Sequence, residues 1–279
     1  TDYEINFSTE VSLDVAEDDE LLALFQQANF TLVYIGIESP NVESLKETKK
    51  NQNIRFPILE QIHKVQSYGI IVWAGMIVGF DHDTENIFVL QEDFFKSSRI
   101  PITSLGPLVA LPTTPLFARM QQEGRLLAEV NLHAVADKNL PILHNNGGFT
   151  NFRPKHMTIN ELFTGYRWLM RKLYSYPEFS KRLKDLLDNM GPSGYESKTF
   201  SPNFKEIQTL FKIMCYFTFT KNTYKRKAFW SLLFHFIRSR PKILYALFSQ
   251  FVMHSHIYDM VLENYGPPEE ALPDSPFHD

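Results

Sequence analysis

The amino-acid sequence predicts an α/β fold, in which a partial parallel (βα) domain is followed by a mostly α-helical C-terminal region. Over the first third of the chain, short runs of strand character alternate with amphipathic helical stretches, and only a few residues connect them. Crossover helices between buried strands imply a parallel sheet. Beyond about residue 159, apolar residues recur at helical spacing instead. A barrel and an open doubly wound sheet would both produce this pattern.

Four strands are expected. Ile5–Leu13 alternates with a period close to two, as strands do. Thr31–Ile37 and Ile70–Val78 are near-continuous apolar runs, which are typical of strands covered on both faces. Thr103–Leu111 completes the set.

Helices are expected after each of these strands. The acidic run that starts at Asp18 suits a helix N-terminus, and Asn29 and Gly69 suit helix ends. The helices expected in the first region are Leu21–Ala28, Phe56–Tyr68, Glu85–Lys96 and Phe117–Leu127. Ile159 to about Met190 should be helical, and two or three further helices should occupy Phe204–Asn264.

These patterns divide the chain into four regions. Residues 1–130 hold the parallel βα domain and residues 131–158 a connecting loop. Residues 159–266 form a helical domain, and residues 267–279 are expected to be a disordered tail.

The start of the sequence suggests that an earlier part is missing. The chain has no initiator methionine and enters a strand pattern almost at once, so we expect a fragment of a larger enzyme. Thr1–Glu4 shows no signal-peptide pattern, and we therefore expect a cytoplasmic protein. The net charge of −4 argues against a nucleic-acid partner. The single cysteine, Cys215, excludes an internal disulfide and a cluster held by this chain's cysteines alone.

Polar and glycine residues stand at the ends of the expected strands, where parallel βα folds carry their functional groups. Glu38 and Ser39 leave a buried strand together, and either a ligand or a structural ion pair would explain Glu38. Glu10 lies mid-strand, where a charge binds something or faces solvent. Gly75 and Gly79 weaken their strand unless a flat group approaches the backbone or the strand bulges there.

Five segments in the right order resemble one known family. They read TEVSLDVAEDDELLALFQQANF, VYIGIESPNVESLKETKKNQN, GMIVGFDHDT, LVALPTTPLFARMQQEGRLL and TNFRPKHMTINELFTGYRWLMRKLYSYPEFSKRL. The first four resemble the later strands of the radical S-adenosylmethionine (SAM) core, in the branch that carries a cobalamin (B12)-binding domain. The fifth is similar to the helical C-terminal domain of unknown function that follows this core.

The resemblance implies a partial (βα) barrel, of which this chain holds only the later strands, together with SAM, a 4Fe-4S cluster and cobalamin. Such enzymes cleave SAM reductively to a 5′-deoxyadenosyl radical, and cobalamin-dependent members transfer a methyl group. The residues that the resemblance implies for SAM binding are Glu10, Glu38, Ser39, Lys50, Gly75, Ile77 and Gly79. It assigns no catalytic or metal-binding residue to this chain. We expect a small-molecule substrate, which would be lipid-like if residues 204–264 lie in a membrane interface.

The sequence departs from the family at two points. Thr113 replaces a glycine in the turn after the last strand, which constrains the backbone if that position needs a positive φ. The CxxxCxxC motif, the first two strands and any cobalamin domain are absent from these residues. We therefore expect this chain to be inactive alone, because without three thiolates the cluster has no site.

Two other classes of function remain open. The chain could be a non-catalytic half-barrel that binds a partner, or an unrelated βα-barrel enzyme with acid–base chemistry at Glu10 and Glu38. An isolated half-barrel would expose a sheet edge, which folded proteins avoid, and this favours the enzyme fragment.

Residues 204–264 combine basic and aromatic side chains. Their apolar stretches are too short to cross a membrane. This region could lie in a membrane interface, or it could be a helical cap packed on the barrel.

Overall fold

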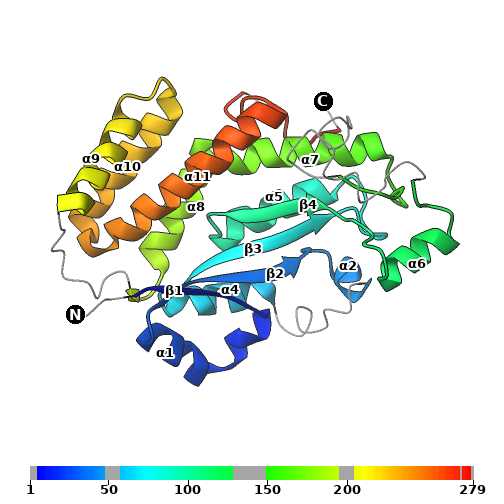
Figure 1. Cartoon of the computed structure of the whole chain (residues 1–279), viewed down its shortest axis with the longest axis horizontal. Helices are drawn as coiled ribbons and strands as arrows, with labels where there is room; N and C mark the ends of the chain where they lie inside the picture. The colour runs from blue at the N-terminus through cyan, green and yellow to red at the C-terminus, as the bar shows by residue number, and fades with distance from the viewer. Residues whose placement is uncertain (1–4, 48–56, 128–148, 195–203, 271, 278–279) are drawn as a thin grey trace.

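The first region forms a four-stranded parallel sheet (Figure 1). The computed structural model describes residues 5–47, 57–127, 149–194, 204–270 and 272–277. The strands are β1 (Phe7–Val11), β2 (Phe30–Glu38), β3 (Ile71–Val78) and β4 (Thr103–Pro107). They lie in sequence order, β1-β2-β3-β4, and every pair is parallel. The predicted α/β class and the four predicted strands are thereby confirmed, although β1 and β4 are shorter than expected.

Helices follow the strands as the crossover pattern requires. Those of the first region are the 3-10 turn η1 (Leu13–Glu17), α1 (Asp19–Gln27), α2 (Val42–Glu47), α4 (Ile58–Ser67), α5 (Ile87–Ser98) and α6 (Pro115–Gln122). Asp18 caps α1 by accepting from Leu21 N at 2.9 Å. Asn29 and Gly69 both have positive φ after a helix, as predicted.

The described residues of the second region are mostly helical from Ile159 to Tyr265. Its helices are α7 (Ile159–Tyr174), α8 (Tyr176–Asn189), α9 (Phe204–Thr218), α10 (Thr223–Ser239), the short η4 (Pro241–Ile243) and α11 (Leu244–Tyr265). The long helical stretch expected over 159–190 is two helices, because the chain turns at Ser175 and Pro177 starts the second. None of the helices in the described ranges is long and apolar enough to cross a membrane.

One hydrophobic core includes side chains of both regions. On one sheet face, alternate residues of β2 and β3 such as Ile35 and Ala74 are fully buried against α4 and α5. The same core includes Leu162, Tyr166 and Leu169 of α7. Helix α7 of the second region is thus part of the hydrophobic core of the βα region.

A second core lies against the opposite face of the sheet, at the N-terminal ends of the strands. It gathers buried side chains of α8, α10 and α11 around Ile71, with Leu32 and Trp73 packed against it. Trp73 Nε1 also donates to Gln250 Oε1 of α11 at 3.1 Å. The helical region therefore covers only the N-terminal half of this face.

Described residues of the tail contact the helical region, and the expectation of a disordered tail stays a prediction. Trp168 Nε1 of α7 donates to Pro273 O at 2.9 Å, and Arg171 pairs with Glu270 at 2.7 Å. The ring of Phe277 lies 6.0 Å from that of Phe88. These contacts with long-range partners hold the described tail residues against α7 and α5.

Candidate functional site

The C-terminal half of the second sheet face carries three of the predicted site residues. Side chains at alternate positions of a strand share a face, and paired residues of neighbouring strands lie in one row. Three rows cross this half: Glu10 and Tyr34, whose next neighbour Trp73 is covered by the second core; Gly36, Gly75 and Ser104; and Ile77 and Gly106. We call this surface the open half-face. It is short of side chains, because three of its members are glycines.

Two members of the open half-face are accessible in different ways. Glu10 is exposed, which agrees with a strand carboxylate that faces solvent. A Cβ built on Gly106 would meet no atom of the described residues within 4 Å, so the backbone there is not covered by them. The surface therefore offers an exposed carboxylate and a bare stretch of backbone.

Gly75 has a neighbour inside the chain. A Cβ at this position would lie 2.6 Å from Tyr34 Oη, far below any normal contact. The phenol of Tyr34 therefore occupies the space above this glycine. The close approach of the Tyr34 phenol explains the glycine at position 75 without a ligand.

Glu38 and Ser39 occupy the turn at the end of β2. Glu38 is half-buried with φ +71, and the pairing register shifts beside it, so that Glu38 lies opposite Met76. Ser39 is fully buried, and its Oγ accepts from Asn41 N at 3.1 Å. The two residues do leave the strand together, with Ser39 serving the turn. The predicted Lys50 lies outside the described residues.

Asp83 organises the turn after β3, a role that was not predicted. Its Oδ2 accepts from Gly79 N at 2.8 Å and from Phe80 N at 3.1 Å, and its Oδ1 from Ser44 Oγ at 2.7 Å. Gly79 has φ +99, which glycine adopts easily. Burial raises the pKa of the Asp83 carboxyl to about 6, although these three donors oppose the rise. An aspartate four residues after Gly79 is the sequence signal that could have indicated this turn.

The backbone groups expected to meet adenine therefore have partners within the chain. Gly79 N already donates to Asp83, and Ile77 O accepts from Gln91 Nε2 at 2.8 Å.

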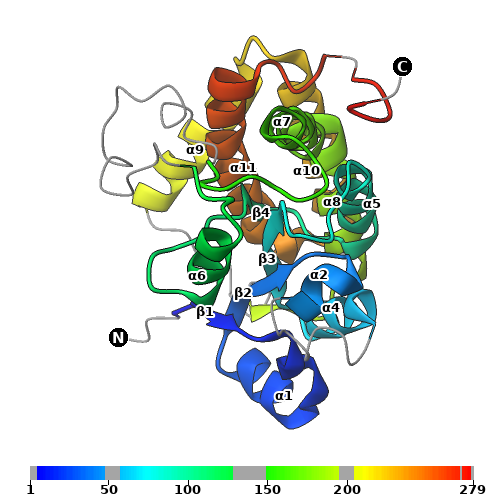
Figure 2. The same ribbon diagram turned by 90° about the vertical axis from the view of Figure 1, so that its right-hand side faces the viewer.

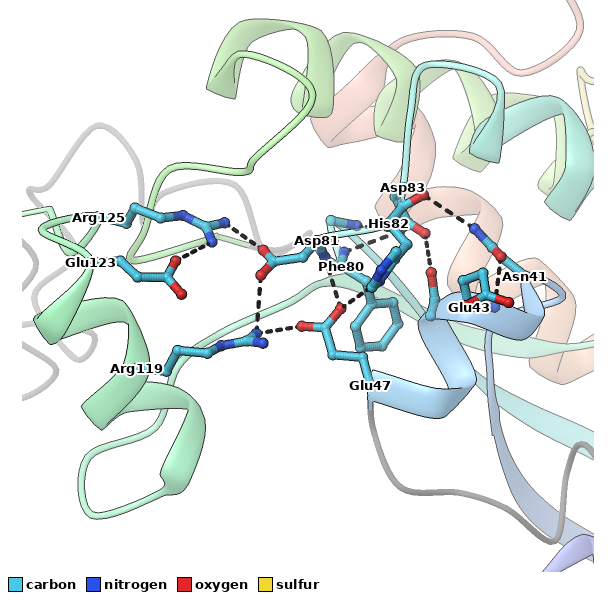
Figure 3. A network of polar contacts seen from close by, with 12 residues as sticks. Asn41, Glu43, Glu47, Phe80, Asp81, His82, Asp83, Arg119, Glu123 and Arg125 are labelled. Atoms are coloured by element: carbon cyan, nitrogen blue, oxygen red, sulfur yellow. Dashed lines mark hydrogen bonds and ion pairs between the residues drawn. The ribbon is translucent and has the colours of Figure 1, made fainter.

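A network of ion pairs closes the same edge of the sheet (Figure 3). Asp81 accepts from Arg125 at 2.6 Å and lies 3.3 Å from the Arg119 guanidinium, which also donates to Glu47. The backbone N of Asp81 donates to Glu47 Oε2 at 3.0 Å. Burial alone would raise the pKa of Asp81, but Arg125 and Arg119 hold it below its usual range.

This network connects three segments that are distant in sequence. Glu47 ends α2, Asp81 follows β3, and Arg119 lies in α6. Figure 2 looks at this end of the molecule, with α6 and α2 on the two sides of the strands. The carboxylates are almost buried, with 9% and 8% of the Glu47 and Asp81 side chains exposed. The pairs thus fix α6 beside the strand ends.

The turn before α6 bears out the expectation for Thr113. Its φ is +69, a value rare for a β-branched residue. Thr114 caps α6 by accepting from Phe117 N at 3.2 Å, and Pro115 starts the helix. The departure from glycine therefore places strain at this turn.

No metal centre is formed by the described parts of the chain. They contain no group of three or more histidine, cysteine, aspartate or glutamate side chains that could hold an ion. Cys215 lies in α9 and is partly exposed, so the open half-face carries no thiol.

Comparison with known proteins adds family relationships. A family described as a domain of unknown function, DUF4070, matches residues 114–265. The chain is 38% identical to the hopanoid C-2 methylase of Rhodopseudomonas palustris over 141 residues, which are 50% of this chain and 27% of that protein. It is 30% identical to an uncharacterized methyltransferase of Synechocystis over 241 residues, 86% of this chain and 42% of the relative. A bacteriochlorophyllide d C-12(1)-methyltransferase of Chlorobaculum tepidum is 24% identical over 64% of this chain and 37% of its own length.

The matched part of each of these relatives is thus less than half of its length. All three are named as methylating enzymes.

Proposed function

The chain belongs to the DUF4070 family, and from this premise we propose that it forms the SAM-binding part of a radical SAM methyltransferase of the cobalamin-binding branch. The observation that carries the proposal is the open half-face. It brings Glu10, Gly75 and Ile77 onto one surface at the C-terminal ends of parallel strands, where such folds bind ligands. The similarity to three methylating enzymes supports the reaction class.

The residues present are suited to SAM. The carboxylates of Glu10 and Glu38 would accept hydrogen bonds from ribose hydroxyls or from the ammonium group of the ligand. The bare backbone at Gly106 leaves room for a flat group such as adenine. Ser39 would act by fixing the turn that presents Glu38, and the backbone at Gly79 is held by Asp83. When bound, SAM would supply the 5′-deoxyadenosyl radical and the methyl group typical of this class.

The residues present do not fit a 4Fe-4S cluster. Three thiolates are needed, and the 279 residues contain one cysteine, in α9. We propose that the cluster and the cobalamin are held by parts of the whole protein outside these residues. This chain alone is therefore expected to bind SAM without cleaving it.

The substrate is proposed to be a largely apolar small molecule. Two relatives are named for methylating a hopanoid and a bacteriochlorophyllide, both of which have extended ring systems.

Isothermal titration calorimetry of the 279-residue chain with SAM tests the proposal. We expect binding by the unmodified chain, weakened roughly tenfold by Glu10→Gln and by Glu38→Gln, since each would lose a charge-assisted hydrogen bond. Glu60→Gln on the exposed side of α4 is the matched control and should leave the affinity unchanged. An unmodified chain that binds no SAM would contradict the proposal and would favour a non-catalytic half-barrel.

A further inference from the structure

Helix α9 carries apolar side chains that nothing in the described chain covers. Phe204, Ile207 and Phe211 are 73%, 51% and 68% exposed. Their spacing of three and four residues places them in one stripe along the helix. Phe217, near the end of α9, is the fully buried member that anchors the helix to the second core. A helix of this length normally buries its apolar stripe, whereas the described residues leave this stripe uncovered.

The neighbouring turn and α10 also carry exposed apolar side chains. Phe219, between α9 and α10, is 80% exposed, the largest exposed fraction among the large apolar side chains described. On α10, Phe234 and Ile237 are 51% and 47% exposed, and the ring of Trp230 lies 5.3 Å from that of Phe234. Aromatic side chains thus remain uncovered on both helices of the pair.

The charge of this segment is opposite to that of the rest of the chain. Residues 204–245 contain nine lysines and arginines and one glutamate, a net charge of +8, whereas the whole chain has −4. Seven of these basic residues are exposed: Lys205, Lys212, Lys221, Arg226, Lys227, Arg238 and Lys242. Lys205 and Lys212 directly follow Phe204 and Phe211, so they border the apolar stripe on one side.

We propose that the α9–α10 pair is a docking surface for an anionic phospholipid membrane. An apolar stripe bordered by lysines suits the membrane interface, where apolar side chains enter the acyl boundary and lysines reach the headgroups. Basic residues near an anionic surface each add to the attraction. A second copy of the chain would bring the same positive charge against this surface, and like charges facing each other oppose association.

The docking surface and the candidate site lie at opposite ends of the molecule. Figure 1 shows α9 and α10 on the left and α2 and α6, beside the strand ends, on the right. Membrane docking therefore leaves the open half-face unobstructed. The inference does not rest on SAM binding, and each can fail without the other.

Co-sedimentation of the 279-residue chain with lipid vesicles tests the proposal. We expect binding to vesicles of equal parts phosphatidylcholine and phosphatidylglycerol, and much weaker binding to phosphatidylcholine alone. The triple variant Phe204→Ser, Ile207→Ser, Phe211→Ser should reduce binding at least about tenfold, because the inserted apolar area is lost. These side chains are exposed, so the variant should fold as the unmodified chain does.

Matched controls distinguish binding through the α9–α10 surface from nonspecific binding to vesicles. Leu24→Ser with Leu90→Ser removes side chains that are 51% and 44% exposed on other helices and should leave vesicle binding unchanged. Lys205→Glu with Lys212→Glu should weaken binding by about fivefold or more for each lysine, whereas Lys181→Glu on α8 should not. Added salt should weaken binding of the unmodified chain.

Three outcomes would overturn the inference: no sedimentation with anionic vesicles, equal sedimentation with neutral vesicles, or equal loss in the control variants. A concentration-dependent dimer in analytical ultracentrifugation that the triple variant abolishes would also overturn it, because the stripe would then be covered by a second copy.

Discussion

The phenol of Tyr34 lies over the backbone of Gly75, and a Cβ on that glycine would be 2.6 Å from Tyr34 Oη. The two residues belong to the same face of adjacent strands, and Tyr34 pairs with Trp73, two residues before Gly75. The tyrosine therefore determines which side chain position 75 can carry.

Gly75→Ala is expected to lower the free energy of unfolding by about 1–3 kcal/mol, because the added methyl group overpacks this contact. Tyr34→Phe should recover part of that loss in the double variant, since the nearest remaining ring atom, Cζ, would be 3.2 Å away. Urea unfolding of the four proteins measures the coupling. Gly106→Ala is the control and should be nearly neutral, because nothing lies within 4 Å. Purely additive effects of the two substitutions would contradict the steric explanation.

Asp83 is expected to make the protein less stable as pH rises. Its pKa is raised from 3.8 to about 6 in the folded state, so the folded protein holds the proton more tightly than the unfolded chain does. Its contribution is fully present below pH 3.8 and is lost as the pH rises through about 6. The change amounts to at most about 3 kcal/mol.

The difference in unfolding free energy between Asp83→Asn and the unmodified protein, measured from pH 4 to pH 7, isolates this effect from the other carboxyls. We expect the variant to gain stability relative to the unmodified protein as the pH rises. A difference that does not vary with pH would show that the carboxyl titrates normally.

Arg125 and Asp81 are expected to be energetically coupled. Only 13% and 8% of their side chains are exposed. Removing the arginine therefore leaves the nearly buried Asp81 carboxylate without one of its cationic partners. Arg125→Ala should destabilise the protein by about 1–3 kcal/mol, and the cycle with Asp81→Ala should give a coupling of about 1 kcal/mol or more. The pair Glu43–Lys46, with both side chains 56% exposed, is the control and should show no measurable coupling. Equal coupling in both pairs would contradict a role for burial.

Thr113→Gly is expected to stabilise the protein. A threonine at φ +69 is strained by about 1–2 kcal/mol. The larger backbone entropy of unfolded glycine offsets part of the relief, which leaves a gain of about 0.5–1 kcal/mol in thermal or urea unfolding. Thr114→Ala next to it should have the opposite sign, because it removes the cap of α6 at a cost of about 0.5–2 kcal/mol. A loss of stability in Thr113→Gly would mean that the threonine makes a compensating contact.

The sequence predicted the elements whose signals are local. The apolar runs at residues 31–37 and 70–78 correspond to β2 and β3 within one residue at each end. The helix ends at Asn29 and Gly69 were also readable, since each depends on one or two neighbouring residues.

The contacts that build the site were not readable, because they join distant positions. Asp83 meets Ser44 across 39 residues, and Glu47 meets Arg119 across 72. No local pattern indicates that Tyr34 lies above Gly75, and the role of this glycine in SAM binding stays a prediction. The break between α7 and α8 was missed although Pro177 marked it.

The close approach of α7 to α5 has a consequence for how this protein can evolve. A Cβ on Gly165 of α7 would lie 2.2 Å from the ring of Phe88 in α5, and both helices belong to one hydrophobic core. The two helices stand on opposite sides of residue 114, where the DUF4070 match begins. Recombination at that boundary would combine position 165 of one protein with position 88 of another, and the two side chains would no longer be selected to fit each other. Substitutions at Phe88 and Gly165 must therefore be inherited together. The helical region can be transferred to another protein only together with the βα region on which it packs.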